Sequence, residues 1–349
     1  MANNSPYRHY NFIDGVRGIA ACLVMLQHSM ENTGIEVLEK GHIGLSWLNL
    51  GEVGVVAFFF VSGFVIPLSL EKWNNIAHFW VNRVFRIYPL YIFTYFLAAA
   101  LTASAGFWIS QMPLNFLVHL FFVQGLFGNI TSFISVAWTL ALEAVWYVGF
   151  TFLFFFRLNK KIPALVGLSV AAGLAGCAIA MANLVRMPMG RLGLLLICVS
   201  GLLCLRRDQK DVSNRVFFPA IAALGVVIAI GLYVGFSLRP GTSPIAPSFV
   251  CIAISWPLGA ALFFIPFFRR SWPLTNNGLV RYLGKISYSI YLLHGVVINL
   301  LCNLFRHSIV SGWYLVAIIA AVTIALSGVT YRFIEYPMIS LSHALRPAK

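Results

Sequence analysis

Long apolar segments alternate with short polar segments from one end of the chain to the other. Ten of the apolar segments approach the length of about 20 residues that a helix needs to cross a bilayer. They cover approximately residues 12–31, 50–70, 88–107, 134–156, 162–182, 190–205, 216–236, 248–268, 286–304 and 312–335. The pattern predicts an all-α, polytopic transmembrane helical bundle with about ten spans.

An eleventh apolar segment, "PLNFLVHLFFVQGLFG" at 113–128, is short and carries Asn115, His119 and Gln124. If it does not cross and the N-terminus lies in the cytoplasm, 19 of the 24 Lys and Arg residues fall on the cytoplasmic side. The other five are Lys40, Arg186, Arg191, Arg239 and Arg306. Because basic residues concentrate on the cytoplasmic side, we expect both termini there. Segment 113–128 is then re-entrant or interfacial.

Composition supports a membrane protein. Of the 349 residues, 60% are hydrophobic and 10% charged, and the mean hydropathy is +0.86. A soluble domain of this size could not bury that much apolar surface. The net charge of +14 lies mostly in short segments between apolar runs, so we expect membrane lipids as partners and no nucleic acid. The polar start "MANNSPYRHYNFIDG" does not resemble a cleavable signal peptide.

The domain organisation is expected to be simple. The chain shows no internal repeat and no soluble-domain pattern, so residues 1–349 are predicted to form one transmembrane domain without an attached soluble domain. The six cysteines all lie in apolar segments and form no C-x-x-C pair. We therefore expect reduced core thiols, and neither a disulfide framework nor a metal site.

The first apolar segment contains Arg17 and His28. Eleven residues correspond to almost three helical turns, so both side chains share one face, about 16 Å apart, and Asp14 joins them. A histidine within a membrane span is costly and is often functional. As a neutral imidazole, His28 could remove a proton from a hydroxyl. Alternatively, it could simply bond a carbonyl or face headgroups near Glu31.

A second candidate is Glu143 in "SVAWTLALEAVWYVGF", where Thr139 and Tyr147 lie one turn to either side. A carboxylate near the middle of a span must be paired or protonated. Function is one interpretation, and a structural pair with a Tyr, Arg or His of another helix is the alternative.

A basic pair, Arg83 and Arg86, shares a helical face in the predicted cytoplasmic loop 71–87, and Pro89 is expected to open the next span. The pair could bind phosphate or only anchor the topology. In "FFFVSGF", Ser62 and Gly63 could admit a thin substrate chain close to the backbone, or form a packing notch.

Two further motifs lie near the C-terminus. In "LGKISYSIYLLHGVV", Ser287, Tyr291 and His294 share one helical face. His294 could be a second residue that transfers protons, or the three could be buried polar residues whose hydrogen bonds are made within the bundle. In "YRFIEYP", Arg332 and Glu335 are expected to form a structural ion pair at a helix end.

In this order, the motifs resemble the integral-membrane acyltransferase family 3, the bacterial O-acyltransferases that modify surface polysaccharides and other molecules. "FIDGVRGIAACLVMLQHS" is similar to the family's opening helix with its R-x10-H pattern at Arg17 and His28. "FFFVSGF", "RVFRIYP", "WTLALEAVWY", "LGKISYSIYLLH" and "YRFIEYP" resemble its later segments. One departure is "ALEAVWY", where the family more often has a second polar residue after the glutamate.

The resemblance implies an enzyme of the bacterial inner membrane that uses acyl-coenzyme A, most often acetyl-coenzyme A, without a metal. It implies a carbohydrate or lipid-linked saccharide as acceptor, within a surface or exported polysaccharide or glycolipid. The expected catalytic residues are His28, Glu143 and Tyr147. Residues expected to bind the donor are Arg17, Arg83, Arg86, Ser62 and Gly63.

Within this interpretation His28 acts as general base or carries the acyl group briefly, Glu143 orients it, and Tyr147 supports the oxyanion. Two other classes stay open on sequence. A proton-coupled transporter could use His28, Glu143 and His294 as a relay, although the repeated halves common in transporters are absent. A non-catalytic subunit of a polysaccharide export complex is the third class.

Overall fold

The computed structural model describes residues 10–33, 35, 47–103, 111–123, 132–182, 187–238, 248–305 and 312–345. Within these ranges every regular element is a helix. The predicted all-α bundle is therefore confirmed.

Nine helical stretches in the described ranges are long and apolar enough to cross a membrane. They are α3 (Leu50–Trp73), α4 (Ile76–Thr102), α7 (Ala137–Phe155), α8 (Ile162–Met181), α9 (Met189–Asp208), α10 (Asn214–Tyr233) with η3 (Val234–Leu238), α11 (Phe249–Phe268), α14 (Ser287–Leu304), and α15 (Trp313–Thr330) with η4 (Tyr331–Glu335) and α16 (Tyr336–Ala344). Shorter helices are α6 (Met112–Leu120), α12 (Pro273–Asn276) and α13 (Gly278–Lys285).

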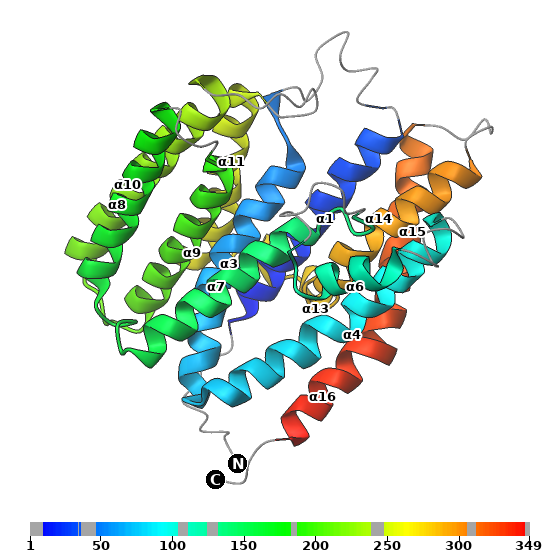
Figure 1. The fold of residues 1–349 in the computed structure, drawn as a ribbon, viewed down its shortest axis with the longest axis horizontal. Helices are drawn as coiled ribbons and strands as arrows, with labels where there is room; N and C mark the ends of the chain where they lie inside the picture. The colour runs from blue at the N-terminus through cyan, green and yellow to red at the C-terminus, as the bar shows by residue number, and fades with distance from the viewer. Residues whose placement is uncertain are drawn as a thin grey trace.

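The remaining predicted span is helix α1 (Asn11–Asn32), whose 22 residues measure about 33 Å. Asp14 and Arg17 near one end and Gln27 and His28 near the other make it less apolar than the nine helices above. It nevertheless lies inside the bundle, packed on α3, α13 and α14 (Figure 1). Burial among other helices lets α1 carry polar groups that lipid would not tolerate.

Close backbone approach holds the start of α1 in place. A Cβ added to Gly284 of α13 would collide with the backbone of Asp14, and one added to Gly18 would collide with the carbonyl of Val280. Only glycine permits helices to come this close. The contact fixes Asp14, and with it the nearby Arg17, against the connection that leads into α14.

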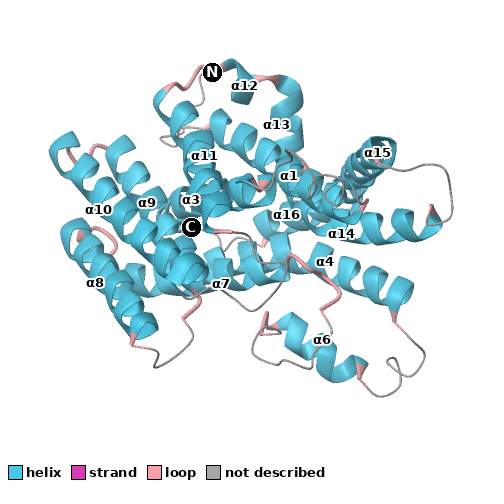
Figure 2. Ribbon diagram, turned by 90° about the horizontal axis from the view of Figure 1, so that it is seen from above, coloured by secondary structure: helices cyan, strands magenta, loops and turns pink. Residues whose placement is uncertain are grey.

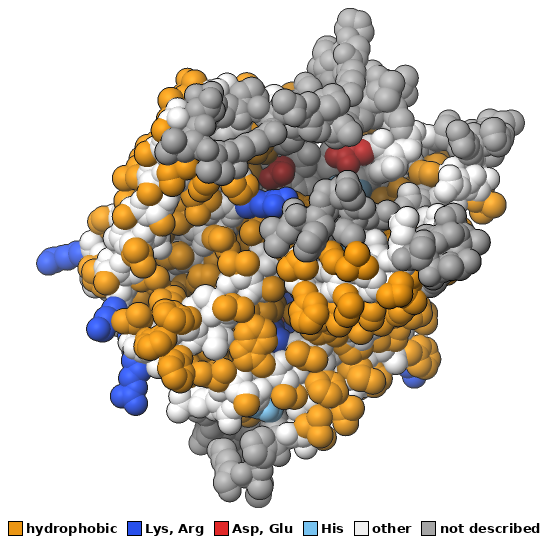
Figure 3. All heavy atoms as spheres, in the orientation of Figure 1, with side chains coloured by type: hydrophobic (Ala, Val, Ile, Leu, Met, Phe, Trp, Pro, Cys, Tyr) orange, Lys and Arg blue, Asp and Glu red, His pale blue; other side chains and the backbone are white. Residues whose placement is uncertain are grey.

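The outer helices present apolar side chains away from the bundle. Leu168 of α8, Val226 of α10 and Leu304 of α14 are 67%, 58% and 69% exposed. Hydrophobic side chains are spread widely over the described part of the face in Figure 3. Such surface is rare on soluble proteins and suits the acyl chains of a bilayer. The chain is therefore a multi-pass membrane protein.

The predicted loop 71–87 is wrong, because α3 continues to Trp73 and α4 already begins at Ile76. Pro89 therefore lies inside α4 rather than at the start of a span. Proline removes one helical hydrogen bond, but packing can override that cost. Beside it, the hydroxyl of Tyr288 donates to the carbonyl of Ile87 at 2.8 Å.

Helix α6 covers residues 113–120 of the short apolar segment 113–128; residues 121–123 follow it outside the helix, and residues 124–128 lie outside the described ranges. The nine residues of α6 measure about 14 Å, less than half of the hydrocarbon thickness of about 30 Å. It lies at the edge of the molecule beside α4 (Figure 2), where Tyr95 donates to Asn115 at 2.9 Å. The described part cannot cross the bilayer by itself, as predicted.

One end of the bundle gathers buried ion pairs. Arg206 near the end of α9 is 1% exposed and pairs with Glu71 near the end of α3. The hydroxyl of Tyr10, just before α1, donates to Asp208 at 2.6 Å. The end of α16 lies at the same end of the bundle (Figure 1). The two described ends of the chain therefore lie at one end of the bundle.

Candidate active site

A cavity of about 260 Å³ lies between α1, α3, α4, α7 and α14. Its polar lining comprises Asp14, Arg17, Ser62, Arg83, Arg86, Thr139, Glu143, Tyr147, Ser287, Tyr288 and Tyr291. The rest of the wall is aliphatic and aromatic. Apolar walls with a few converging polar groups are typical of ligand sites, and this volume is near the lower end of their usual range.

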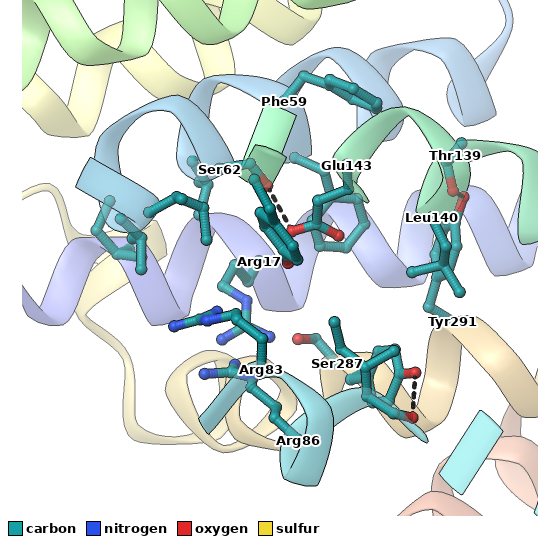
Figure 4. A pocket seen from close by; sticks show the side chains of 18 of the residues that line it. Arg17, Phe59, Ser62, Arg83, Arg86, Thr139, Leu140, Glu143, Ser287 and Tyr291 are labelled. Atoms are coloured by element: carbon teal, nitrogen blue, oxygen red, sulfur yellow. Dashed lines mark hydrogen bonds between the residues drawn. The ribbon is translucent and has the colours of Figure 1, made fainter. Parts of the chain in front are cut away.

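Three arginines dominate the charge of the cavity. Arg17 comes from α1, and Arg83 and Arg86 come from successive turns of α4, so that their side chains extend toward one another (Figure 4). Arg83 donates to the hydroxyl of Ser69 at 3.1 Å. Its buried Nε has no partner among the described residues. No salt bridge in the described part of the chain neutralises any of the three guanidinium groups.

Glu143 faces the same cavity from α7. Its Oε1 accepts a hydrogen bond from the hydroxyl of Ser62 at 3.0 Å (Figure 4). One turn further along α7, the ring of Tyr147 lies 5.7 Å from the guanidinium carbon of Arg83. The fold therefore brings together six of the residues that the sequence singles out, namely Arg17, Ser62, Arg83, Arg86, Glu143 and Tyr147.

Gly63 does not belong to this group. It lies on the side of α3 that faces α9, where an added Cβ would collide with the backbone carbonyl of Cys198. Gly201 on α9 meets the carbonyl of Phe60 in the same way. Gly63 lets two helices pack closely and is not part of the cavity lining, whereas its neighbour Ser62 faces the cavity; a contact of Gly63 with the donor stays a prediction.

Tyr291 and Thr139 form one wall of the cavity. Their hydroxyl oxygens are 2.7 Å apart, and the Thr139 hydroxyl also donates to the carbonyl of Val136 at 2.8 Å. Since a threonine hydroxyl has a single hydrogen, Tyr291 must be the donor of the bond to Thr139. The ring of Tyr291 lies 6.0 Å from the ring of His294, which is outside the cavity lining.

His28 also lies outside the cavity lining, near the opposite end of α1 from Arg17. Its Nδ1 is 2.8 Å from Oε2 of Glu31, and its ring stacks on that of His294 with the centroids 5.4 Å apart. His294 lies between His28, on which it stacks, and Tyr291, which lines the cavity. Glu143, the expected orienting group, hydrogen-bonds Ser62 on the arginine side.

Sequence reasoning missed part of this arrangement. Tyr288, which no motif singled out, lines the cavity. Ser287, singled out together with Tyr291 and His294, lines it too, and its buried hydroxyl has no partner among the described residues. The Glu31–His28 contact was visible as a spacing of three residues on one helix. The stacking of His294 on His28 joins helices far apart in sequence, and only coordinates reveal it.

The expected ion pair between Arg332 and Glu335 is not formed. The carboxylate of Glu335 is 3% exposed and accepts a hydrogen bond from Ser289, while the guanidinium of Arg332 lies 5.9 Å from the ring of Phe333. The predicted helix end is also wrong. The chain stays helical through η4 into α16, with Pro337 in the first turn of α16 directly after the π-helical stretch.

Comparison with known families identifies the class of protein. The family profile described as an acyltransferase domain, Acyl_transf_3, matches residues 10–332. The chain therefore belongs to acyltransferase family 3, and with its apolar helices it is a membrane-spanning acyltransferase. The resemblance drawn from the motifs is confirmed.

Individual relatives are distant but extensive. The chain is 25% identical to acyltransferase MdmB of Streptomyces mycarofaciens, over 96% of this chain and 93% of MdmB. It is 26% identical to exopolysaccharide production protein ExoZ of Rhizobium meliloti (strain 1021), over 80% of this chain and 83% of ExoZ. SACOL0978 of Staphylococcus aureus (strain COL), provisionally named an O-acetyltransferase, is 24% identical over 95% of this chain and 58% of that protein. No solved structure matches the chain.

Proposed function

We propose that this enzyme moves an acyl group, most simply acetyl, from acyl-coenzyme A to a hydroxyl of a surface or exported polysaccharide or glycolipid. The observation that carries the proposal is the cavity in which Arg17, Arg83 and Arg86 converge without a salt bridge among the described residues. Guanidinium groups bind phosphate oxygens with paired hydrogen bonds, and coenzyme A carries three phosphates.

The residues present fit such a donor. The buried Arg83 Nε and Ser287 hydroxyl have no described partner and line or adjoin the cavity, so a ligand could satisfy them. A volume of about 260 Å³ is too small for a whole coenzyme A but suits a narrow chain between apolar walls. The arginines would hold phosphates, and the pantetheine arm would extend along the cavity toward Tyr291.

The distance along α1 supports a donor that binds with its phosphates at Arg17 and its thioester near His28. Arg17 and His28 are eleven residues apart, about 16 Å along the helix axis, which a pantetheine arm can cover. We propose that the thioester reaches the histidine pair beyond Tyr291. Glu143 and Tyr147 would then contact the donor within the cavity, with Ser62 holding the Glu143 carboxylate in place.

In the proposed reaction His28 acts as general base. Its imidazole takes the proton of the acceptor hydroxyl, the oxygen attacks the thioester carbonyl, and the carbon–sulfur bond breaks. The leaving thiolate then takes the proton from His28 and departs as free coenzyme A. The alternative is a relay. In it an imidazole nitrogen of His28 attacks the thioester, the carbon–sulfur bond breaks and coenzyme A leaves with the imidazole proton; the acceptor oxygen then attacks the acyl-histidine, the carbon–nitrogen bond breaks, and the hydroxyl proton returns to the imidazole. Acid-quenched single turnovers with labelled acetyl-coenzyme A would separate the two, because only the relay leaves label on the protein.

The proposed location is the bacterial inner membrane with both termini in the cytoplasm. The charge distribution supports it, since the end of the bundle that carries Arg206 also carries the described chain ends. Acyl-coenzyme A would enter there, close to the arginines. A cytoplasm-active reporter fused after Lys349 should be active, and an inactive reporter would overturn the orientation.

The similarity to ExoZ, which is named for exopolysaccharide production, supports the proposed acceptor class. A test of the whole proposal uses purified protein in lipid nanodiscs with ¹⁴C-acetyl-coenzyme A and octyl β-glucoside as a sugar acceptor. We expect acceptor-dependent release of coenzyme A thiol and labelled acetylated glucoside. Failure to consume acetyl-coenzyme A with any sugar or lipid-linked saccharide acceptor would contradict the proposal.

A further inference from the structure

A chain of hydrogen bonds leads from helix α3 to His28. The backbone N–H of Leu50 donates to Oε1 of Gln27 at 2.9 Å. This bond fixes the orientation of the Gln27 amide, because only its oxygen can accept. Its Nε2 therefore points to Glu31 and donates to Oε1 of that carboxylate at 2.9 Å.

The other oxygen of Glu31 faces His28. Oε2 of Glu31 is 2.8 Å from Nδ1 of His28, and an ionised carboxylate can only accept. Nδ1 must therefore carry the proton, which leaves the lone pair of the neutral imidazole on Nε2. The side chains of His28 and Glu31 are 36% and 29% exposed, so an acceptor molecule can approach this group.

His294 is the only other titratable group in described contact with His28. Its ring stacks on His28 with an interplanar angle of 10°, and its Nδ1 is 3.1 Å from the carbonyl of Ile290. A carbonyl only accepts, so Nδ1 of His294 is also protonated and its buried Nε2 has no described partner. His294 therefore offers His28 a stacked ring and no hydrogen bond, and Glu31 is the carboxylate in described contact with His28.

We propose that Glu31, held by Gln27, is the positioning residue of His28 and fixes the tautomer in which Nε2 is the base. The inference rests on the proposed acyl transfer and assigns the orienting role to Glu31 instead of Glu143. Glu143 bonds Ser62 and lines the arginine cavity, whereas Glu31 touches the imidazole directly. A carboxylate on Nδ1 also stabilises the imidazolium that forms when Nε2 takes the acceptor's proton.

The test compares three variants in nanodiscs, with acetyl-coenzyme A as donor and octyl β-glucoside as acceptor. Glu31→Gln should lower kcat about a hundredfold or more and leave the donor KM within about twofold, because an amide permits the wrong tautomer. Gln27→Leu should lower kcat about three- to tenfold. Glu143→Gln is the matched control: the same chemical change in the other region should lower kcat much less than Glu31→Gln does, because Glu143 hydrogen-bonds Ser62 rather than His28.

A spectroscopic signature separates positioning from loss of structure. In ¹⁵N-histidine-labelled protein, His28 should show the Nδ1–H tautomer, which should persist in Glu143→Gln and change in Glu31→Gln. The proposal is overturned if Glu31→Gln keeps normal kcat, or if its His28 signal is that of the unmodified protein. Loss of the tautomer in Glu143→Gln alone would return the role to Glu143. Absence of acetyl transfer by the unmodified protein would instead contradict the proposed function itself, whereas normal turnover of His28→Ala would remove only His28 from the mechanism.

Discussion

The two ends of helix α1 are built in opposite ways. At one end Arg17 joins residues from α3, α4, α7 and α14 around a cavity, so the site exists only in the folded bundle. At the other end His28 takes its hydrogen-bond partner, Glu31, from the same helix, while the ring of His294 comes from α14 and the backbone N–H that holds Gln27 comes from α3. The first region is assembled by tertiary packing, and the second is largely local.

The chemistry of the two regions also differs. The arginine cavity is cationic, with buried donors that lack described partners, which suits a polyanionic ligand. The histidine region is partly exposed and pairs an imidazole with a carboxylate, which suits proton transfer. We therefore propose that one region binds the donor and the other does the chemistry, with Tyr291 between them. The following predictions test that division, from the largest expected effect to the smallest.

The largest effect is expected at His28. His28→Ala should lower kcat by about a hundred- to ten-thousand-fold, because it removes the general base. The measurement is release of coenzyme A thiol from acetyl-coenzyme A with octyl β-glucoside as acceptor. Near-normal turnover at saturating donor and acceptor would remove His28 from the mechanism and leave His294 as the next candidate.

The arginine cavity should respond in a different parameter. Arg86→Ala and Arg83→Ala should each raise the donor KM about ten- to a hundredfold and change kcat less, since a charge-assisted bond to phosphate is worth about 1.5–3 kcal/mol. Arg17→Ala should behave alike. Arg215→Ala, an exposed arginine of α10, is the control and should leave KM unchanged. Unchanged donor KM in all three cavity variants would show that the donor binds elsewhere.

Tyr291 belongs to both regions, and its removal should have an intermediate effect. Tyr291→Phe deletes the hydroxyl that donates to Thr139 and keeps the ring beside His294. We expect kcat to fall about three- to tenfold, the value of one neutral hydrogen bond of 0.5–1.5 kcal/mol, with donor binding unchanged. A rise in donor KM larger than the fall in kcat would assign Tyr291 to the binding region alone.

The smallest effect on turnover per folded molecule is expected at Gly63. Gly63→Ala should lower the thermal unfolding temperature in detergent, because its Cβ collides with the Cys198 carbonyl, yet leave kcat and KM of the folded fraction unchanged. Gly167→Ala is the matched control on α8, where an added Cβ meets nothing within 4 Å. A higher donor KM in Gly63→Ala at normal stability would restore Gly63 to the donor site.

The spans could be predicted because bilayer thickness sets the length of an apolar helix. The start of α4 could not, because Arg83, Arg86 and Pro89 have the composition of a cytoplasmic loop. In the fold, the two arginines line a cavity, and Tyr288 donates to the backbone beside the proline. Tertiary contacts of this kind overrule local propensity and leave no trace in periodicity.

For the candidate site, the sequence predicted individual residues but not which of them contact one another. Arg17, Ser62 and Glu143 stood out individually as polar residues in apolar segments, and the fold brings them together. The sequence pattern led us to expect Glu143 as the carboxylate that orients His28. In the fold, the carboxylate that contacts His28 is Glu31, three residues away on the same helix. Spacing shows which residues share a face, but hydrogen-bond partners depend on how helices are rotated and displaced in the bundle.

The central claim is that donor binding and chemistry lie at opposite ends of α1. Equilibrium binding of ¹⁴C-acetyl-coenzyme A to purified His28→Ala and Arg86→Ala proteins in nanodiscs tests it most directly. The account predicts that His28→Ala binds the donor with a Kd within about twofold of the unmodified enzyme, while Arg86→Ala binds at least about tenfold more weakly. Equal loss of binding in both variants, or loss in His28→Ala alone, would contradict it.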